Sequence, residues 1–217
     1  MIVLLDLDGT VWDSEPGIVA CLRHAFNQLG LAVPDHEILT GGVGPPLQTM
    51  LAELGVPGDR LDEGVAHYRE RYLRAGVFEA SLYEGVVEML DGLAASGHRL
   101  ATATSKGEVP TGVMLDHFGL THRFEVIGAA TMDTTAVTKA QVLARTLAAL
   151  GDPPRDQCVL VGDRSYDVEG AAAHGLHCIG ATWGYGGADE LRMAGAELLA
   201  AHPLDVCALV DGGSFRP

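Results

Sequence analysis

The first residues of the chain form an apolar run that stops abruptly in acidic residues. Residues 2–5 (Ile-Val-Leu-Leu) are all apolar, which predicts a strand buried on both faces, as in a parallel sheet covered by helices. Asp6 and Asp8 follow, at the strand end where open α/β sheets carry their catalytic groups. Because residues two apart on a strand point the same way, we expect these carboxylates to share a cation. Mg²⁺ suits such a site, since it binds carboxylate and carbonyl oxygens.

Beyond residue 83 the pattern alternates between helices and short strands. Strands are predicted at 99–103, 124–127, 157–161, 177–181 and 197–200, and helices at 86–95, 107–118, 138–150, 165–174 and the C-terminus. This alternation predicts βαβ units and hence an α/β fold with a doubly wound parallel sheet. The first strand then belongs to the same sheet.

Residues 14–80 interrupt this pattern. Apolar residues recur there at helical spacing, which predicts helices near 16–30, 35–40, 45–54 and 58–75. The glycine-rich stretch 41–46 follows no strand, so it indicates a turn between helices and not a dinucleotide-binding loop. We therefore predict an all-helical domain at 14–80, inserted into an α/β domain formed by 1–13 and 81–217.

Composition limits the partners of the chain. The 217 residues include 14 basic and 29 acidic ones, a net charge of −15, which argues against nucleic acid or an anionic membrane as a partner. A small anionic substrate remains compatible with this charge. No apolar run approaches the ~20 residues of a membrane span, and Met1 leads directly into a strand, so we expect a cytoplasmic protein without a signal peptide. The four cysteines and nine histidines show no zinc-ligand spacing.

Polar residues that could take part in catalysis or binding follow three further strands. Thr104 and Ser105 end the strand at 99–103, where the next helix offers N–H groups to an anion, although a hydroxyl pair there is also an ordinary N-cap. Lys139 opens the helix at 138–150 and is, with Lys106, one of only two lysines. A third cluster, at the end of 157–161, comprises Gly162, Asp163 and Asp167.

These strand ends resemble the motifs of the haloacid dehalogenase superfamily of phosphotransferases. Residues 6–10 (DLDGT) resemble its nucleophile motif DxDGT, and residues 162–167 (GDRSYD) its acidic motif GDxxxD. Thr104, Ser105 and Lys139 stand at its second and third motifs, in the family's order. The helical insertion corresponds to the smaller helical cap class, and residues 183–186 (WGYG) resemble the phosphoglycolate phosphatase and 5′-nucleotidase-like branch. The sequence departs from the family where Glu84 replaces a usual Pro and Ser105 a frequent Asn.

The resemblance implies a role for each of these residues. Asp6 would attack phosphorus to form an aspartyl-phosphate, and Asp8 would act as general acid and then activate water. Thr104, Ser105 and Lys139 would hold the phosphoryl oxygens. Mg²⁺ is expected on the Asp6 carboxylate, the backbone carbonyl of Asp8 and Asp163. The supporting residues would be Gly9, Thr10, Gly162 and Asp167.

The expected activity is Mg²⁺-dependent hydrolysis of a small phosphorylated metabolite by a monomer or homodimer. A phosphoglycolate phosphatase-like reaction is the first expectation and a 5′-nucleotidase-like reaction the alternative. A sugar phosphomutase shares the core and differs in how the cap excludes water. A phospho-accepting signalling domain also combines clustered aspartates with Thr/Ser and Lys, but its acceptor would lie on a later strand and it would need no helical insertion.

Overall fold

The computed structural model describes residues 1–131 and 137–213. Its main feature is a parallel six-stranded sheet with the strand order β5-β4-β1-β6-β7-β8. The strands are β1 (Ile2–Leu5), β4 (Arg99–Gly107), β5 (Val126–Ala130), β6 (Cys158–Gly162), β7 (His177–Ala181) and β8 (Leu198–Ala200). The chain runs outward from β1 to β5, then returns to β6 on the other side of β1. This order confirms the predicted doubly wound α/β fold and puts the switch point, where such folds bind ligands, at β1 and β6.

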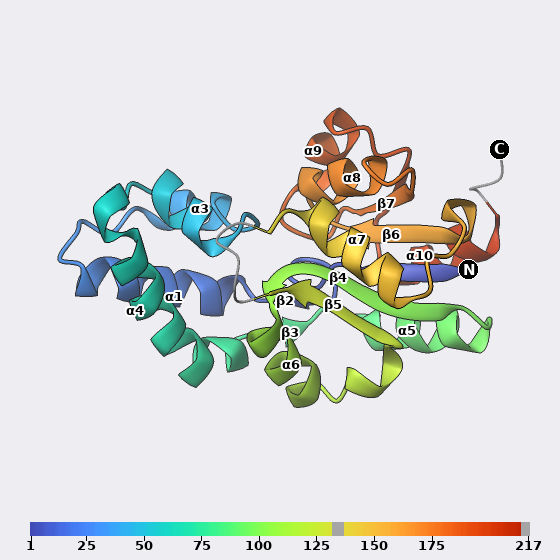
Figure 1. Cartoon of the computed structure of the whole chain (residues 1–217), viewed down its shortest axis with the longest axis horizontal. Helices are drawn as coiled ribbons and strands as arrows, with labels where there is room; N and C mark the ends of the chain where they lie inside the picture. Colours follow the sequence, from blue (N-terminus) through green and yellow to red (C-terminus); the bar gives the residue numbers. More distant parts are fainter. Residues whose placement is uncertain (132–136, 214–217) are drawn as a thin grey trace.

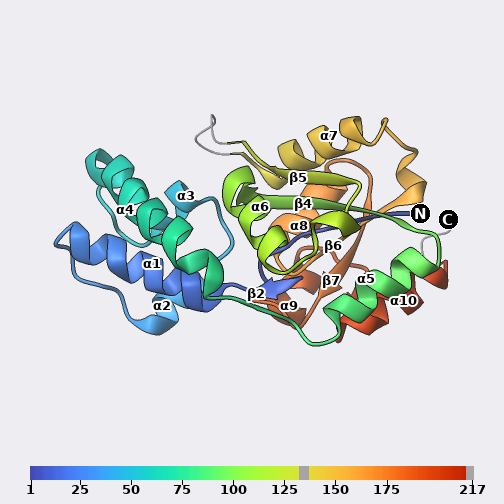
Figure 2. The same cartoon turned by 90° about the horizontal axis from the view of Figure 1, so that it is seen from below.

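Helices cover both faces of the sheet. The helices α7 (Lys139–Ala149), α8 (Ser165–Ala172) and α9 (Gly187–Met193) pack on one face, and α5 (Val86–Ala95), α6 (Glu108–His117) and α10 (Pro203–Asp211) on the other (Figures 1 and 2). Along β1, Ile2 and Leu4 join the core beneath α7 and α8, whereas Val3 and Leu5 join the core on the opposite face. Both faces of β1 are therefore buried, which explains why its sequence is apolar throughout.

Residues 14–80 form helices beyond the carboxyl ends of the strands (Figure 1). They are α1 (Glu15–Gln28), α2 (His36–Gly41), α3 (Leu47–Glu53) and α4 (Leu61–Arg74), and we call them the helical segment. The chain enters through β2 (Trp12–Asp13) and returns through β3 (Ser81–Leu82), which pair antiparallel. Short 3₁₀ turns complete the described structure: η1 (Gly58–Arg60), η2 (Gly76–Phe78), η3 (Thr121–Arg123) and η4 (Arg155–Gln157). The two domain ranges stay a prediction, and 81–217 includes 132–136 and 214–217, which lie outside the described residues.

Two strands differ from their predicted limits by more than one residue. The strand predicted at 99–103 continues to Gly107, which pairs with Ala130 after a shift of register. Helix α6 accordingly begins at Glu108 with Gly107 as its N-cap, so Thr104 and Ser105 do not cap it. The strand predicted at 124–127 runs from Val126 to Ala130. Both strands are longer because they pair with each other. Residues 104–107 are of types common in turns, so nothing in the sequence indicates that they continue a strand.

Candidate active site

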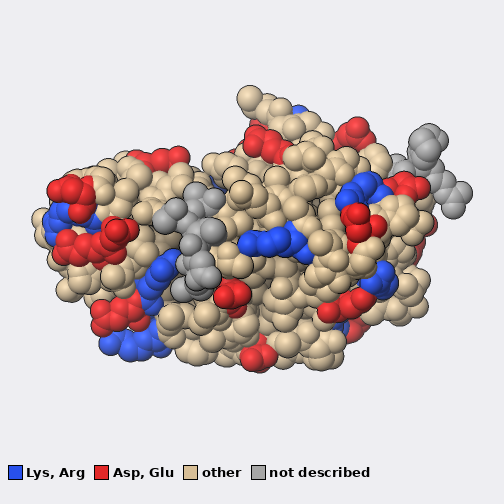
Figure 3. Space-filling view, viewed as in Figure 1, with Lys and Arg blue, Asp and Glu red and all other residues tan. Residues whose placement is uncertain are grey.

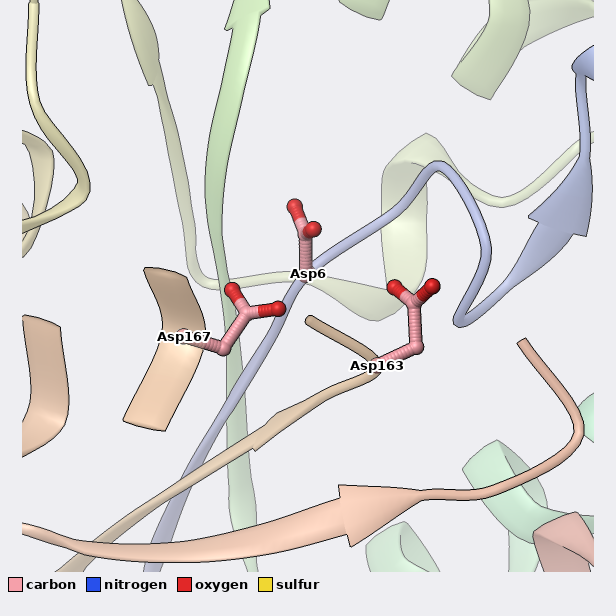
Figure 4. A group of neighbouring side chains, drawn as sticks. All are labelled: Asp6, Asp163 and Asp167. Carbon is pink, nitrogen blue, oxygen red and sulfur yellow. The ribbon is translucent and has the colours of Figure 1, made fainter. Parts of the chain in front are cut away.

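Three carboxylates meet at the carboxyl edge of the sheet. Asp6 follows β1, Asp163 follows β6 and Asp167 lies in the first turn of α8 (Figure 4). One carboxylate oxygen of each lies within 4.8 Å of the others, and all three residues are buried. The adjacent strands bring them together, and the backbone N–H of Asp6 donates to the carbonyl of Val161 at 2.9 Å. Sequence reasoning placed Asp6 and Asp163 at one site, and the structure adds Asp167 directly to this carboxylate cluster.

Lys139 supplies the positive charge of the cluster. Its ammonium lies 2.8 Å from Asp6 Oδ1 and 2.7 Å from Asp167 Oδ1, and it donates to the carbonyl of Ala103 at 2.8 Å. Burial alone would lower the pKa of Lys139, but the charges of Asp167 and Asp6 raise it above its ordinary value, so the ammonium stays charged. Burial raises the pKa of Asp6 to about 6, against the opposing effect of Lys139.

Removing Lys139 should destabilise the protein strongly. With its side chain only 4% exposed, Lys139→Ala would leave buried carboxylates uncompensated, which typically costs about 3–5 kcal/mol. Urea unfolding at pH 8 in EDTA measures the change. Arg192→Ala is the control, because Arg192 pairs with Asp189 at the exposed surface and should contribute nothing measurable. A loss no larger than that of the control would show that the ammonium does not stabilise the cluster.

The carboxylate cluster fits a divalent cation. Among the described residues, Asp6 Oδ1 and Asp167 Oδ1 are buried without a hydrogen-bond partner, apart from their ion pairs with Lys139. Burial raises the pKa of Asp163 well above its ordinary value, and the charges of Asp167 and Asp6 raise it further. A cation bound between these oxygens would relieve that repulsion. Buried carboxylate oxygens are the ligands that Mg²⁺ prefers in proteins.

The predicted supporting residues pack directly against these carboxylates. Thr10 donates its hydroxyl to Asp163 Oδ1 at 3.1 Å. Gly9 has a φ of 82°, and a Cβ there would lie 2.2 Å from Asp163 Oδ2. A Cβ at Gly162 would lie 2.2 Å from the carboxyl carbon of Asp167. Only glycine therefore lets the backbone approach the carboxylates this closely.

The carboxylate of Asp8 lies apart from the cluster. Lys106 donates to its Oδ1 at 3.0 Å and its Oδ2 at 2.9 Å, and Oδ1 also accepts from Trp12 Nε1 at 2.8 Å and from the Ser14 hydroxyl at 2.6 Å. Burial would raise the pKa of Asp8, but these donors together lower it. The Asp8 carboxylate is thus held by these donors and is not one of the three carboxylates that lie within 4.8 Å of one another. The strand ends at Leu5, so the rule for residues two apart does not extend to Asp8.

Sequence reasoning singled out Lys106 but gave it no role in the site. Besides Asp8, its ammonium donates to the hydroxyl of Tyr72 in α4 and lies 4.6 Å from the centre of that ring. Lys106 and Tyr72 therefore join the sheet edge to the helical segment. The signals for Lys106 were its rarity, as one of two lysines in the chain, and its place directly after Thr104 and Ser105. Tyr72 had only its helical spacing and its place in the helix expected to face the substrate.

A cavity of about 300 Å³ brings the predicted groups together. Its floor includes Asp6, Asp8, Thr104, Ser105 and Lys139. The helical segment contributes the facing wall, which includes Leu47, Gln48, Tyr68 and Arg69. Thr104 is buried and Ser105 half-buried. The hydroxyls proposed from the sequence to hold phosphate therefore line the same cavity as Asp6, Asp8 and Asp167, whereas Asp163 lies behind its lining.

The chain is similar to known proteins in both sequence and structure. The family model of haloacid dehalogenase-like hydrolases matches residues 3–181. Tyrosine-protein kinase PtkA of Mycobacterium tuberculosis is 44% identical over 188 residues, covering 87% of this chain but only 64% of PtkA. A 5′-nucleotidase of Pseudomonas aeruginosa is 35% identical over 207 residues, covering 95% of this chain and 90% of that protein. A predicted phosphatase from Clostridium acetobutylicum superposes with a TM-score of 0.91 at 32% identity, over 97% of this chain and 98% of the other. Proteins named phosphoglycolate phosphatase match at lower identity.

Proposed function

Because the chain belongs to the haloacid dehalogenase-like hydrolases, we propose that it is a Mg²⁺-dependent phosphomonoester hydrolase that works through an aspartyl-phosphate on Asp6. One observation supports this most: Asp6 shares a cavity with the lysine, hydroxyls and acidic groups that phosphoryl transfer requires. Such transfer depends mainly on positioning and charge stabilisation.

Each residue then has a defined task. A carboxylate oxygen of Asp6 forms a bond to phosphorus, and the ester oxygen leaves with a proton from Asp8. Asp8, now ionised, accepts a proton from the water that attacks the aspartyl-phosphate, which releases phosphate and restores Asp6. The ion pair with Lys106 favours this ionised form of Asp8. Thr104, Ser105 and Lys139 would hold the non-bridging oxygens.

Asp6, Asp163 and the backbone carbonyl of Asp8 would hold Mg²⁺. The ion would neutralise charge where an anionic nucleophile meets an anionic ester. Asp167 contacts Lys139 at 2.7 Å and would orient that ammonium.

Mg²⁺ should therefore stabilise the folded protein. At a concentration 100 times its Kd, a ligand bound only by the folded state adds about 2.7 kcal/mol. A thermal unfolding scan of the metal-free protein with increasing MgCl₂ should show Tm rising. Asp163→Asn should lose most of this rise, whereas Asp189→Asn, at an exposed position, should keep it. Equal responses of the two variants would show that Asp163 does not bind the ion.

The proposed substrate is a small phosphorylated metabolite. A cavity of about 300 Å³ accommodates a compact ester. Acidic and basic side chains are interspersed on the face seen in Figure 3, and the net charge of −15 disfavours nucleic acid. Within the described part of the chain, none of the helices has the length and apolar character needed to cross a membrane. A panel with 2-phosphoglycolate, nucleoside 5′-monophosphates and sugar phosphates tests this proposal, and no hydrolysis of any ester would refute it.

We expect the helical segment to carry specificity. Leu47, Gln48 and Arg69 line the cavity opposite the carboxylates, so replacing them should redistribute activity among the esters of the panel by about 10-fold or more. Hydrolysis of a very small ester should change little. Lys139→Ala is the reference, because it should depress every substrate alike. If the three variants also lowered all substrates equally, the helical segment would complete the catalytic site and would not select the substrate.

The 44% identity to PtkA supports a second candidate. An aspartyl-phosphate on Asp6 could pass its phosphoryl group to a tyrosine hydroxyl in place of water. Incubation with radiolabelled ATP and a tyrosine-containing peptide distinguishes the two activities. Label on the peptide, lost in Asp6→Asn, would favour this candidate, whereas release of phosphate from simple esters alone would favour the hydrolase.

A further inference from the structure

Helix α1 is not capped by its own N-cap residue. Ser14 occupies the N-cap position and is fully buried, yet its hydroxyl makes no capping hydrogen bond. It donates instead to Asp8 Oδ1 at 2.6 Å. A serine at this position usually accepts a hydrogen bond from the N–H of the second or third helical residue. The start of α1 therefore needs an acceptor from elsewhere.

Two side chains supply acceptors: Asp13 Oδ1, which accepts from the backbone N–H of Glu15 at 3.0 Å, and the hydroxyl of Tyr185, in the loop between β7 and α9. The hydroxyl oxygen accepts from the backbone N–H of Ser14 at 2.8 Å and of Glu15 at 3.1 Å. It donates to Asp13 Oδ1, also at 3.1 Å. A tyrosine hydroxyl offers one donor and two acceptor sites, and these three bonds serve this turn of the chain; the Ser14 hydroxyl also lies 3.4 Å from it.

The same loop is fixed to the carboxylate cluster. The backbone N–H of Tyr185 donates to Asp163 Oδ2 at 2.8 Å, and Trp183 Nε1 donates to the carbonyl of Thr10 at 3.0 Å. Between them, a Cβ at Gly184 would lie 2.3 Å from the Asp163 Cβ, so the loop packs tightly against that residue. A continuous set of hydrogen bonds thus runs from Asp163 through Tyr185 and Ser14 to Asp8.

We propose that Tyr185 is a positioning residue for the reaction. By fixing the start of α1, it keeps the Ser14 hydroxyl on Asp8 and so holds that carboxylate in the orientation needed for proton transfer. The inference deepens the proposed hydrolase function and rests on it. A purely structural cap would instead change stability and leave the chemical step unaffected.

A double-mutant cycle separates these possibilities. Ser14→Ala removes a hydrogen bond to an ionised carboxylate, so kcat for p-nitrophenyl phosphate should fall about 10- to 100-fold. KM should stay within about twofold, because Ser14 does not line the cavity. Tyr185→Phe keeps the ring and should lower kcat about tenfold. The double variant should match Ser14→Ala, since both changes act through one contact.

The control is Ser96→Ala, which removes a serine hydroxyl that donates to Asp211 at 3.0 Å on the exposed surface. It should leave kcat unchanged. If the two losses of kcat multiplied in the double variant, the positioning role would be overturned. A Tyr185→Phe protein with a lower Tm and a normal kcat would overturn it as well. If the wild-type protein hydrolysed none of the esters, the proposed hydrolase function itself would be refuted.

Hydrogen exchange supplies a readout independent of activity. The amide of Ser14 should exchange faster in Tyr185→Phe, because its acceptor is gone, whereas the Glu15 amide also donates to Asp13 Oδ1 and should change less. In Ser14→Ala the Glu15 amide should keep its protection. Unchanged exchange in Tyr185→Phe would show that its hydroxyl does not fix the start of α1, and would overturn the inference even if kcat fell.

Discussion

Asp6→Asn should abolish phosphatase activity while leaving the fold intact. Asparagine has nearly the same shape as aspartate but lacks the anionic oxygen that attacks phosphorus, so kcat should fall by roughly 10⁴- to 10⁶-fold, as when other covalent enzymes lose their nucleophile. The substitution also removes one charge from the crowded cluster with Asp163 and Asp167, so we expect no loss of stability. Steady-state assays with circular dichroism measure both effects.

Asp189→Asn, the same change at an exposed residue, is the control and should behave like wild type. Substantial turnover by Asp6→Asn would exclude Asp6 as the nucleophile. Full wild-type activity in excess EDTA would exclude the requirement for Mg²⁺, whichever residue is the nucleophile.

Asp8→Asn should slow the reaction without preventing the binding of phosphate. General acid–base groups typically contribute about 10²- to 10⁴-fold, so kcat should fall within that range. The carboxylates of the cluster and Lys139 remain, and the amide oxygen of the substituted side chain could still accept from Trp12 and Ser14, as Asp8 Oδ1 does now. Orthovanadate, a phosphate analogue, should therefore inhibit residual turnover with a Ki within a few-fold of wild type.

Loss of vanadate binding would give Asp8 a different role. The residue would then be first a ligand of the anion or metal and only second a carrier of protons. Asp13→Asn offers a nearby comparison, because Asp13, at the end of β2, also accepts hydrogen bonds but does not line the cavity. That variant should retain much more activity than Asp8→Asn.

Local sequence patterns were sufficient for the sheet and its acidic edge. The apolar stretch of β1 and the regular alternation after residue 83 are patterns among residues that lie close together in the sequence. Such patterns can be recognised without knowledge of the fold. Strand ends in such a sheet meet at one edge, so Asp6 and Asp163 could be grouped from the sequence pattern, whereas Lys139, at the start of a helix, was placed by the family resemblance. The structure confirms their proximity.

Contacts between distant segments could not be predicted in this way. Lys106 is 98 residues from its partner Asp8, and Tyr185 is 171 residues from Ser14. Neither pair has a spacing that local periodicity can reveal. The N-cap of α1 shows the consequence: Ser14 matched the local preference for a cap, but a tertiary contact with Asp8 took its hydroxyl instead.

Chemical trapping of the covalent intermediate tests most directly whether Asp6 is the nucleophile. Enzyme mixed with Mg²⁺ and substrate is acid-quenched within milliseconds and reduced with borohydride, which converts an aspartyl-phosphate to homoserine. Peptide mass spectrometry then locates the change. We expect homoserine at position 6 with substrate present, and none without substrate or in Asp6→Asn. Homoserine at position 8 or 163, or continued turnover with no trapped residue under conditions that trap a known aspartyl-phosphate enzyme, would contradict the proposed mechanism.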